Sequence, residues 1–424
     1  MRKKVNRLLK KALRAFMDDQ LTKSEELLDS IRSFDLDSKS KLKFNRVLNI
    51  MSLGSLYGLN TLSQILSALH IKSNNLHKIW SNATYEQVQS FVKHFGEDNF
   101  KTHLLALAKK DDSAWSRAQV TIVADDSIFR QWLKNMPKGE QFAKFFSGQY
   151  HKTVYGFRVS LVGVALGDTF YPLYFLVVPK GECSKKAALK SLKKAHQLIK
   201  NTLEGEGLSS PNLTFSVDSG FTDEALIVYC EAQDIKFVGV PKKNNKFQIG
   251  SYDLNLTNYI EKVFLKKEQQ YLAKCKAENI DPKPFYLRKK GIYQALGKKV
   301  TLLFFRLKDS KKVSVIFCND LTISAKFMRR RFFQRTKIEQ FFRLLKDTLK
   351  IQQTKSVDAE SFIKKLATCI FKAMVCQNFR IYCNKKFKDF KKWAFTKLRL
   401  HIVYDHVELD MLEQLVKNKG FCKQ

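Results

Sequence analysis

Proline, paired cysteines and acidic side chains are all scarce in this chain of 424 residues. With 7 prolines and 44% hydrophobic residues, the composition argues for a folded protein and against a disordered one. The 8 cysteines are dispersed and form no Cys-x-x-Cys pair, so no zinc site is expected. Cysteines in this pattern are typical of reduced thiols in a cytoplasmic protein.

Long apolar runs are also missing. Residues 1–17 are basic and amphipathic, but they contain no apolar core long enough for a secretion signal. The most apolar stretch, residues 161–178, is interrupted by Gly167-Asp168-Thr169 and by Pro172, which makes it a poor membrane span. We therefore expect a soluble intracellular protein that does not cross a membrane.

Positive charge, by contrast, is abundant. Lys and Arg number 76 against 40 Asp and Glu, which gives a formal net charge of +36. Because the cations are spread through the chain, several surfaces are expected to face one large polyanion. Nucleic acid is the best candidate, since neutralising its phosphates releases counterions and drives binding.

The spacing of apolar residues predicts helical ends and an α/β centre. Residues 1 to about 115 show the three-and-four spacing of helices. Residues 61–80 fit a helix-turn-helix, a pattern that any two short amphipathic helices also give. The strands predicted in the centre are 120–124, 152–166, 170–178, 213–217 and 236–240, with helices at 185–202 and 222–232.

A charged segment, residues 242 to about 320, separates these elements from the next helix. It contains three strand-like pieces, at residues 291–296, 300–307 and 313–317. After the next helix, the chain is predicted to be helical again from about residue 356, and it is rich in Lys over residues 384–397.

The helix over residues 329–349 organises the rest of the chain. At about 100° per residue, one stripe of this helix carries Phe332, Arg335, Glu339, Arg343 and Lys346. A separate apolar stripe suited to burial carries Ile338, Phe341, Phe342, Leu345 and Leu349. The run Arg329-Arg330-Arg331, next to Phe332 and Phe333, favours contact with nucleic acid. A Glu between two Arg residues is also a common helical ion-pair ladder, so the stripe alone does not define a site.

Two of the predicted strands end in acidic residues. Asp125 and Asp126 follow the first strand, and Asp218 follows the fourth. Functional groups gather at strand ends in open mixed sheets, so these residues could meet at one edge and the late helix could bring Glu339 to them. Three carboxylates in one place repel unless divalent cations neutralise them. Hard oxygen ligands suit Mg²⁺ or Mn²⁺, and two such ions support an in-line phosphoryl displacement.

This arrangement resembles the ribonuclease H-like catalytic domain of DDE transposases, and more specifically the insertion-sequence-four group of bacterial transposases. That group carries Tyr-x2-Arg-x3-Glu-x6-Lys around its catalytic Glu. Arg335, Glu339 and Lys346 stand at those spacings, and Phe332 takes the Tyr position. The resemblance extends over roughly residues 118 to 350.

The two Asp positions also match that group. Its first Asp usually stands in Asp-x-Thr/Ser, which Asp125-Asp126-Ser127 matches, and this favours Asp125 over Asp126 as the first metal ligand. Its second Asp follows an apolar strand, as Asp218 does here. Because Phe332 lacks the Tyr hydroxyl, a hairpin intermediate stays an open question; Phe332 could stack on a base or simply pack in the core.

The resemblance implies a ribonuclease H-like α/β fold, with a mixed five-stranded sheet flanked by helices. A β-rich insertion would precede the last catalytic helix, and both ends of the chain would be helical. The implied domains are a helical DNA-binding domain (1–115), the first part of the catalytic domain (116–243), the insertion (244–318), the final catalytic helix with Glu339 (319–355) and a helical domain for DNA contact or dimerisation (356–424).

The resemblance also implies a site and a reaction. Asp125, Asp218 and Glu339 would hold two Mg²⁺ or Mn²⁺ ions, with Asp126 as a substitute for Asp125. The implied DNA contacts are Arg330, Phe332, Arg335, Lys337, Arg343 and Lys346. The enzyme would bind the terminal inverted repeats of its element, cut at the ends and join the 3′ hydroxyls to target DNA.

The same resemblance implies a homodimer in the synaptic complex and a place in the bacterial cytoplasm, associated with the nucleoid. Two alternatives remain. One is a transposase-derived DNA-binding protein without catalytic activity. The other is a nuclease on the same fold that does not join strands.

Overall fold

The computed structural model describes residues 82–109, 120–131, 141–147, 151–242, 245–306, 310, 312–353 and 358–386, and isolated positions before residue 52. The proposed helix-turn-helix and most of the Lys-rich segment lie outside the described residues. The chain divides into two compact units, which are described separately below. The first unit comprises residues 1–100, 128–158 and 341–424, and the second comprises residues 101–127 and 159–340.

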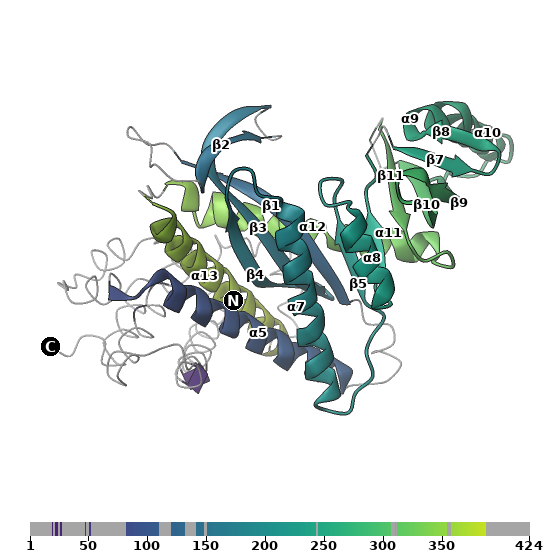
Figure 1. The fold of residues 1–424 in the computed structure, drawn as a ribbon. Helices are drawn as coiled ribbons and strands as arrows, with labels where there is room; N and C mark the ends of the chain where they lie inside the picture. Colours follow the sequence, from purple (N-terminus) through teal and green to yellow (C-terminus); the bar gives the residue numbers. More distant parts are fainter. Residues whose placement is uncertain are drawn as a thin grey trace, which may run out of the picture. The chain divides into compact units, whose positions relative to one another are not determined.

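The described strands form one mixed sheet of 11 strands (Figure 1). They are β1 (Val120–Arg130), β2 (Phe142–Ser147), β3 (Lys152–Leu166), β4 (Thr169–Val178), β5 (Thr214–Val217), β6 (Lys236–Gly239), β7 (Lys246–Ile249), β8 (Tyr252–Asn255), β9 (Tyr286–Tyr293), β10 (Lys298–Arg306) and β11 (Val313–Cys318). Their order is β2-β3-β1-β5-β6-β11-β10-β9-β7-β8, and β4 pairs with β3.

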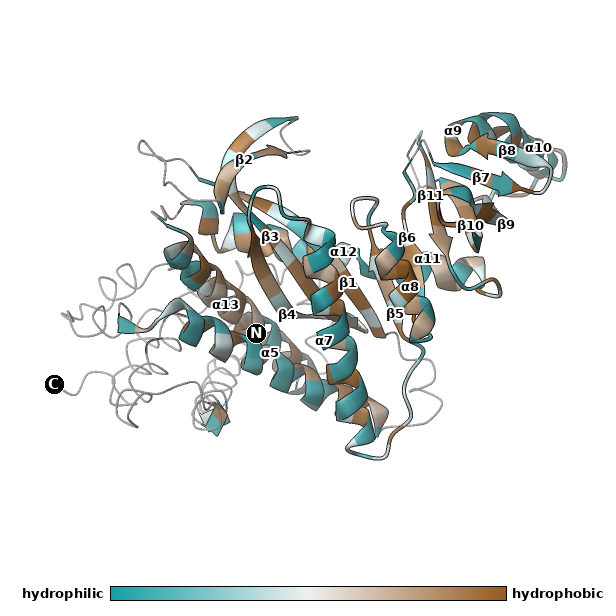
Figure 2. Ribbon diagram, in the orientation of Figure 1, coloured by the Kyte–Doolittle hydropathy of each residue, from teal (hydrophilic) through white to brown (hydrophobic). Residues whose placement is uncertain are grey.

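The second unit is centred on the parallel strands β1, β5 and β6. Val123 lies opposite Ser216 of β5, and Val217 of β5 lies opposite Gly239 of β6. Residues 120–124 of β1 and all four residues of β5 are buried, as are Phe237, Val238 and Gly239 of β6. Such buried runs are typical of parallel strands that are covered on both faces. Figure 2 shows the apolar residues concentrated on the strands.

Helices cover this part of the sheet. They are α7 (Ser184–Glu204), which packs on β4, α8 (Glu224–Ala232), which packs on β6, and α11 (Ala325–Gln334), which packs on β5 and β6. One face of α7 is buried through Ala188, Leu192, Ala195, Ile199 and Leu203. The start of α8 is capped by Asp223, whose carboxylate accepts a hydrogen bond from the Ala225 N–H (3.1 Å). The mixed α/β class predicted from the sequence is therefore confirmed.

The first unit contains α13 (Ala359–Lys386) and most of α5 (Tyr85–Ala108). The ring of Phe371 on α13 lies 5.4 Å from that of Phe91 and 4.8 Å from that of Phe95. The ring of Phe362 stacks on Phe157 of β3 at 4.2 Å. Buried aromatic pairs thus join the helices to one another and to the strand.

The sheet is larger than the five strands predicted from the sequence. The predicted strands correspond to β1, β3, β4, β5 and β6. Strand β2 was not predicted, because its buried residues Phe142 and Phe145 are three positions apart and Phe146 is 68% exposed. This spacing obscures the period of two that marks a half-buried strand.

The segment between β6 and α11 combines strands and helices. Its helical part comprises α9 (Leu256–Tyr259), the π-helical turn η1 (Ile260–Phe264) and α10 (Leu265–Ala277). Helix α10 buries only Cys275, so its sequence carries little apolar periodicity. Strand β11 pairs antiparallel with β6, where Cys318 lies opposite Val238, and β10 and β9 follow it. The strands of this segment thus continue the main sheet.

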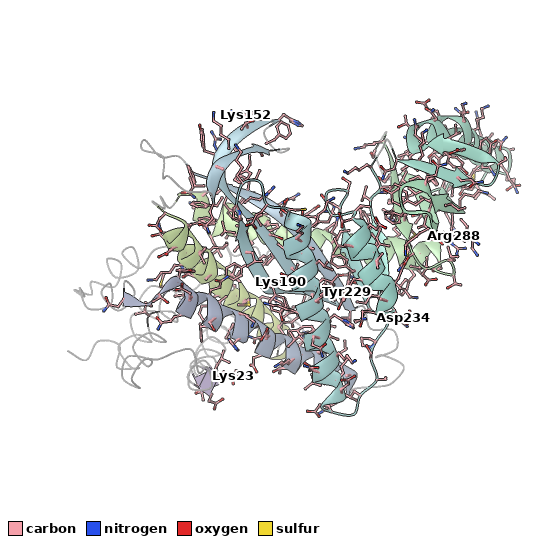
Figure 3. All side chains as sticks on the ribbon, in the orientation of Figure 1. Lys23, Lys152, Lys190, Tyr229, Asp234 and Arg288 are labelled. Atoms are coloured by element: carbon pink, nitrogen blue, oxygen red, sulfur yellow. The ribbon has the colours of Figure 1, made fainter. Side chains whose placement is uncertain are left out.

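Exposed cations come from separate segments of the described chain. Lys23, Lys152, Lys190 and Arg288 are exposed cations from four separate segments (Figure 3). The six cysteines whose side chains are described are free thiols. In the described part of the chain, no helix is long and apolar enough to span a membrane.

Candidate active site

Asp125 and Asp218 come together because β1 and β5 are parallel neighbours. The register pairs Val123 with Ser216, so residues 125 and 218 stand at the same level of the sheet. Strand β1 continues to Arg130, so Asp125 lies within the strand and not after it. Burial, followed by the negative charge of Asp218, raises the pKa of Asp125 to about 8, although Arg335 opposes this shift.

Asp218 begins the turn that leads from β5 to α8. Its Oδ1 accepts hydrogen bonds from the N–H groups of Gly220 (2.8 Å) and Phe221 (3.3 Å). A short polar side chain that bonds the backbone two residues on forms a compact turn. This turn fixes the position of the Asp218 carboxylate at the edge of the sheet.

Asp126 points away from this pair. Its Oδ2 accepts a hydrogen bond from the hydroxyl of Ser184, the first residue of α7, at 3.0 Å. Successive side chains of a strand face opposite sides of the sheet, so Asp125 and Asp126 are directed apart. The pKa of Asp125 is raised by the charge of Asp218 and lowered by that of Arg335.

Arg335 lies between the acidic residues of the sheet and Glu339. It stands at the junction of α11 and α12 (Thr336–Arg343). Its Nη2 lies 2.7 Å from Glu339 Oε1, and its Nη1 lies 3.9 Å from Asp125 Oδ2. The side chains of Arg335 and Asp125 are only 15% and 14% exposed, so this ion pair is weakly screened.

The donor set fits a divalent cation at the sheet edge. Asp125 and Asp218 are hard oxygen ligands, and their mutual repulsion is a cost that a divalent cation would relieve. The carboxylate of Glu339 is held by Arg335 instead. Within the described residues, no group of three or more His, Cys, Asp and Glu side chains is arranged to hold a metal ion.

The helix that carries Glu339 is less regular than predicted. The Arg335 N–H donates to Phe332 O (3.0 Å) and the Ile338 N–H donates to Arg335 O (3.1 Å), so the chain tightens where α11 meets α12. A π-helical turn, η3 (Leu344–Thr348), follows α12. The predicted apolar stripe is confirmed, because Ile338, Phe341, Phe342, Leu345 and Leu349 are all buried.

Arg343 and Lys346 belong to the first unit. Arg343 is exposed at the end of α12. Lys346 lies in η3, and its ammonium is 5.2 Å from the centroid of the Phe129 ring. The azimuth predicted for Lys346 assumed a regular α-helix, which the π-helical turn replaces.

Phe332 is half-buried and has two kinds of neighbour. It packs against a buried cluster that includes Val238, Ile316 and Met328, and its ring centroid lies 5.4 Å from the guanidinium of Arg335. It also lines a cavity of about 520 Å³ together with Ser219, the residue that follows Asp218. Phe332 therefore packs against the core and also lines the cavity.

Arg330 and Lys337 lie away from the Glu339 stripe. Arg330 is exposed on α11. The ammonium of Lys337 donates to Gly167 O in the turn between β3 and β4, and it lies 3.7 Å from Asp168. Both cations line a second cavity, which is described below.

Arg331 is a buried residue that the charge pattern does not reveal. It is 1% exposed, donates to the Thr121 hydroxyl (3.3 Å), and lies 4.5 Å from the centroid of the Phe327 ring. Burial lowers the pKa of Arg331 to about 10. Its position was available from the sequence, because Arg331 lies seven residues before Ile338 and thus on the apolar stripe of the helix.

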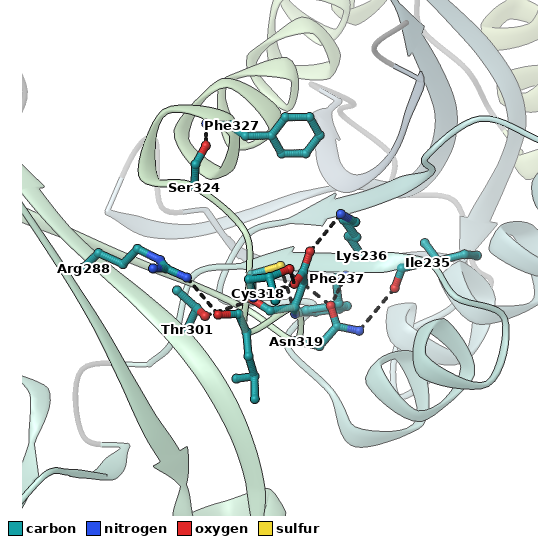
Figure 4. A network of polar contacts seen from close by, with 12 residues as sticks. Ile235, Lys236, Phe237, Arg288, Thr301, Cys318, Asn319, Ser324 and Phe327 are labelled. Carbon is teal, nitrogen blue, oxygen red and sulfur yellow. Dashed lines mark hydrogen bonds and ion pairs between the residues drawn. The ribbon is translucent and has the colours of Figure 1, made fainter. Parts of the chain in front are cut away.

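A polar network fixes the segment that leads from β11 into α11 (Figure 4). The Asn319 amide accepts from the Phe237 N–H (2.8 Å) and donates to Ile235 O (3.2 Å), so it continues the pairing of β6 and β11. Asp320 lies 2.8 Å from the Lys236 ammonium. Ser324 then caps α11 by accepting from the Phe327 N–H (3.2 Å). The position of the helix that carries Arg335 thus depends on this network.

One comparison with known proteins identifies a family. Residues 141–375 match the family model described as the transposase DDE domain. The match spans more than half of the chain and includes Asp218, Arg335 and Glu339, whereas Asp125 lies before its start. No curated protein matches the chain.

Proposed function

Because the chain belongs to the transposase DDE domain family, we propose that it is the transposase of a bacterial insertion sequence of the insertion-sequence-four group. Transposase activity itself follows from the family, whose members are metal-dependent nucleases and strand transferases acting on DNA. The spacing of Arg335, Glu339 and Lys346 supports the narrower group. The observation that supports the proposal is that Arg335 pairs with Glu339 (2.7 Å) and lies 3.9 Å from Asp125, whose pKa is raised by the negative charge of Asp218.

In this proposal, Asp125, Asp218 and Glu339 hold two Mg²⁺ or Mn²⁺ ions. When bound, such ions activate the attacking hydroxyl and neutralise charge on the scissile phosphate. Asp218 is oriented by its turn, and Asp125 by its place in a buried strand. To join that site, the Glu339 carboxylate would have to leave Arg335, and the guanidinium would then lack this carboxylate partner.

The freed Arg335 is then available to the substrate. A guanidinium grips a phosphate through two parallel hydrogen bonds, and this geometry suits a phosphodiester next to the cut. Arg343 and Lys346 act as further phosphate contacts. Phe332 offers its ring to a base at the cavity that it shares with Ser219.

The proposed reaction is cut-and-paste transposition. The segment 1–115 binds the terminal inverted repeats, and the enzyme hydrolyses the DNA at the element ends. The freed 3′ hydroxyls then attack target DNA directly. Two copies act together in a synaptic complex, to which residues 356–424 contribute DNA contacts or dimer contacts. A strongly basic chain that acts on DNA is expected to associate with the nucleoid.

The decisive experiment uses Glu339→Gln. The amide keeps an oxygen that can accept a hydrogen bond from Arg335 but loses the negative charge that a metal ligand needs. Metal-dependent cleavage of DNA that carries the element ends should fall by more than about 100-fold, because even outer-shell partners of a metal site are worth 10–100-fold. Binding to the same DNA in a gel-shift assay should change little.

Glu278→Gln is the matched control, since Glu278 is an exposed carboxylate in the second unit, paired only with Lys274 at 3.6 Å. If Glu339→Gln cleaves at nearly the wild-type rate, the assigned site is wrong. If wild-type protein binds the ends but never cleaves them, the inactive alternative holds. Cleaved ends without joined product under any condition would favour the nuclease alternative.

A further inference from the structure

A cavity beside α11 is not used by the proposed chemistry. Its volume is about 710 Å³, which lies within the range of small-molecule sites. Its walls come from the start of β9, from α11 and from the first turn of α12. The lining residues that matter here are Tyr286, Lys326, Arg329, Arg330, Phe333 and Lys337.

The aromatic wall of this cavity is held by the protein core. The ring centroids of Tyr286 and Phe333 lie 6.4 Å and 6.3 Å from that of Phe305, which is 1% exposed. Both residues pack against the buried cluster that contains Leu303 and Met328. Because these rings are fixed by packing, a flat ligand meets a preformed surface and orders little on binding.

A guanidinium completes this wall. The Arg329 guanidinium lies 5.2 Å from the centroid of the Tyr286 ring and 5.3 Å from that of Phe333, and it donates a hydrogen bond to the Tyr286 hydroxyl. Among the described residues, the buried Nε of Arg329 has no hydrogen-bond partner. The guanidinium and the two rings thus form one continuous wall.

The rim of the cavity is positively charged. Lys326 and Arg330 are exposed, and Lys337 adds a third cation at the far end. None of the described residues that line the cavity is acidic. Aromatic rings beneath a ring of cations form the combination that binds single-stranded nucleic acid, in which bases stack and phosphates are neutralised.

The cavity is separate from the candidate active site. Asp125, Asp218, Arg335 and Glu339 are not among the residues that line it. Arg330 lies on α11 and Glu339 on α12, the next helix. DNA bound in the cavity would therefore be held by a different set of residues from DNA at Glu339.

We propose that this cavity binds one unpaired nucleotide of a DNA strand. The base lies against Tyr286 and Phe333, and the neighbouring phosphates contact Lys326 and Arg330. A duplex keeps its bases stacked inside and offers only phosphates to the rim, so the apolar wall favours a single strand. The inference rests on the proposed function only in taking DNA as the polyanion.

The test measures binding of labelled single-stranded DNA of about 10 nucleotides, a length within the site sizes of single-strand-binding proteins. The full chain is used, with a chelator present, and binding is followed by fluorescence anisotropy. An abasic strand of the same length serves as the second probe. Stacking of one base is worth about 1–3 kcal/mol, so Tyr286→Leu should weaken binding of the ordinary strand by about 5-fold or more.

The abasic strand makes this result specific. Tyr286→Leu should leave its affinity nearly unchanged, and Tyr286→Phe, which keeps the ring, should bind the ordinary strand like the wild type. Arg330→Ala should weaken both probes and lower the slope of log K against log salt by about 0.7. Lys290→Ala is the matched control, because Lys290 is an exposed cation on β9 that does not line the cavity.

Three results would overturn the proposal. They are an equal effect of Tyr286→Leu on both probes, an effect of Arg330→Ala no larger than that of Lys290→Ala, or no binding of single strands at all. Thermal unfolding of each variant shows whether it is folded, and Phe333→Leu replaces Tyr286→Leu if the latter is not. The binding test contains no metal and so does not depend on cleavage. If the protein binds single strands in this base-dependent way but does not cleave DNA, only the proposed function is contradicted.

Discussion

The carboxylate of Asp125 destabilises the folded protein at this site. Its carboxylate is buried in β1 beside Asp218, and the pKa of Asp125 rises to about 8 although Arg335 lies 3.9 Å away. The counter-charge is thus too weak to offset burial and repulsion. Groups arranged at such a cost are typical of functional sites, where activity is kept at the expense of stability.

This cost predicts a stabilising mutation. Burial, followed by the charge of Asp218, raises the pKa of Asp125 from 3.8 to about 8, so folding at neutral pH costs free energy to protonate this carboxyl. Asp125→Asn removes that cost while it keeps the size of the side chain, so the metal-free protein should become more stable at neutral pH. Thermal unfolding would show it, with a rise in Tm of roughly 2–4 °C for each kcal/mol gained.

Addition of Mg²⁺ extends the same measurement. It should raise the Tm of the wild type, because an ion that binds only the folded state stabilises it, and it should raise the Tm of Asp125→Asn much less. Asp126→Asn is the comparison, because Asp126 bonds Ser184 on the other side of the strand. A lower Tm for Asp125→Asn, or equal metal responses in both variants, would contradict this account.

Arg331 and Lys337 show what residue-level analysis of the sequence can miss. Both belong to a basic helix, yet Arg331 lies in the core beneath β1 and Lys337 contacts the turn between β3 and β4. The period of the helix gives the azimuth of each side chain but not the element that packs there. Burial of Arg331 could be predicted from its place on the apolar stripe, whereas its hydrogen bond to Thr121 could not.

At the scale of elements, the junction between β11 and α11 sets the position of the candidate catalytic helix. Asp320 lies between Lys236 and Thr322 and is fixed to the sheet by the bond from the Thr301 hydroxyl to its carbonyl (2.9 Å). Burial alone would raise the pKa of Asp320, but hydrogen bonds from Lys236 and Thr322 outweigh it and lower the pKa to about 2.

The depressed pKa of Asp320 predicts a pH dependence. In the unfolded chain its pKa is near 3.8, so the folded state favours the ionised form. The contribution to the free energy of unfolding is fully present above pH 4 and is lost as pH falls towards 2. Asp320→Asn should lower stability at neutral pH by roughly 1–2 kcal/mol and should reduce this acid-dependent loss.

Denaturant unfolding at several pH values would measure the effect, with Asp281→Asn as the control because Asp281 is exposed. Equal pH profiles for Asp320→Asn and the wild type would refute the assigned role. If Asp320→Asn lowers metal-dependent cleavage under conditions where the variant is fully folded, the junction also positions α11.

The elements themselves were predictable to different degrees. The strands β3 and β4 contain long apolar runs, and β1, β5 and β6 contain short buried runs, so the sequence signal for these five strands is strong. Helix α10 and strand β2 bury few residues in a regular period, so they could not be predicted. The pairing of β11 with β6 also could not be predicted, because register between distant strands depends on contacts that no local pattern encodes.

At the scale of the whole molecule, the net charge of +36 governs association with DNA. Each phosphate that is neutralised contributes about −0.9 to the slope of log K against log salt for duplex DNA. Exposed cations such as Lys152 and Lys190 on separate segments provide a general attraction. Residues predicted to contact the element ends should instead add to the salt slope only where the bound DNA places a phosphate beside them.

Lys346 allows these two contributions to be separated. It lies in the π-helical turn η3, with its ammonium near the Phe129 ring, and the proposal gives it a phosphate at the element end. Lys346→Ala should weaken binding to end-containing DNA and lower the salt slope by about 0.9, one phosphate contact. Lys190→Ala removes the same charge from the exposed face of α7 and should change the slope much less. Filter-binding titrations at several salt concentrations measure the slopes of both variants. Equal slopes would mean that Lys346 contributes to binding through its charge alone and not through its position.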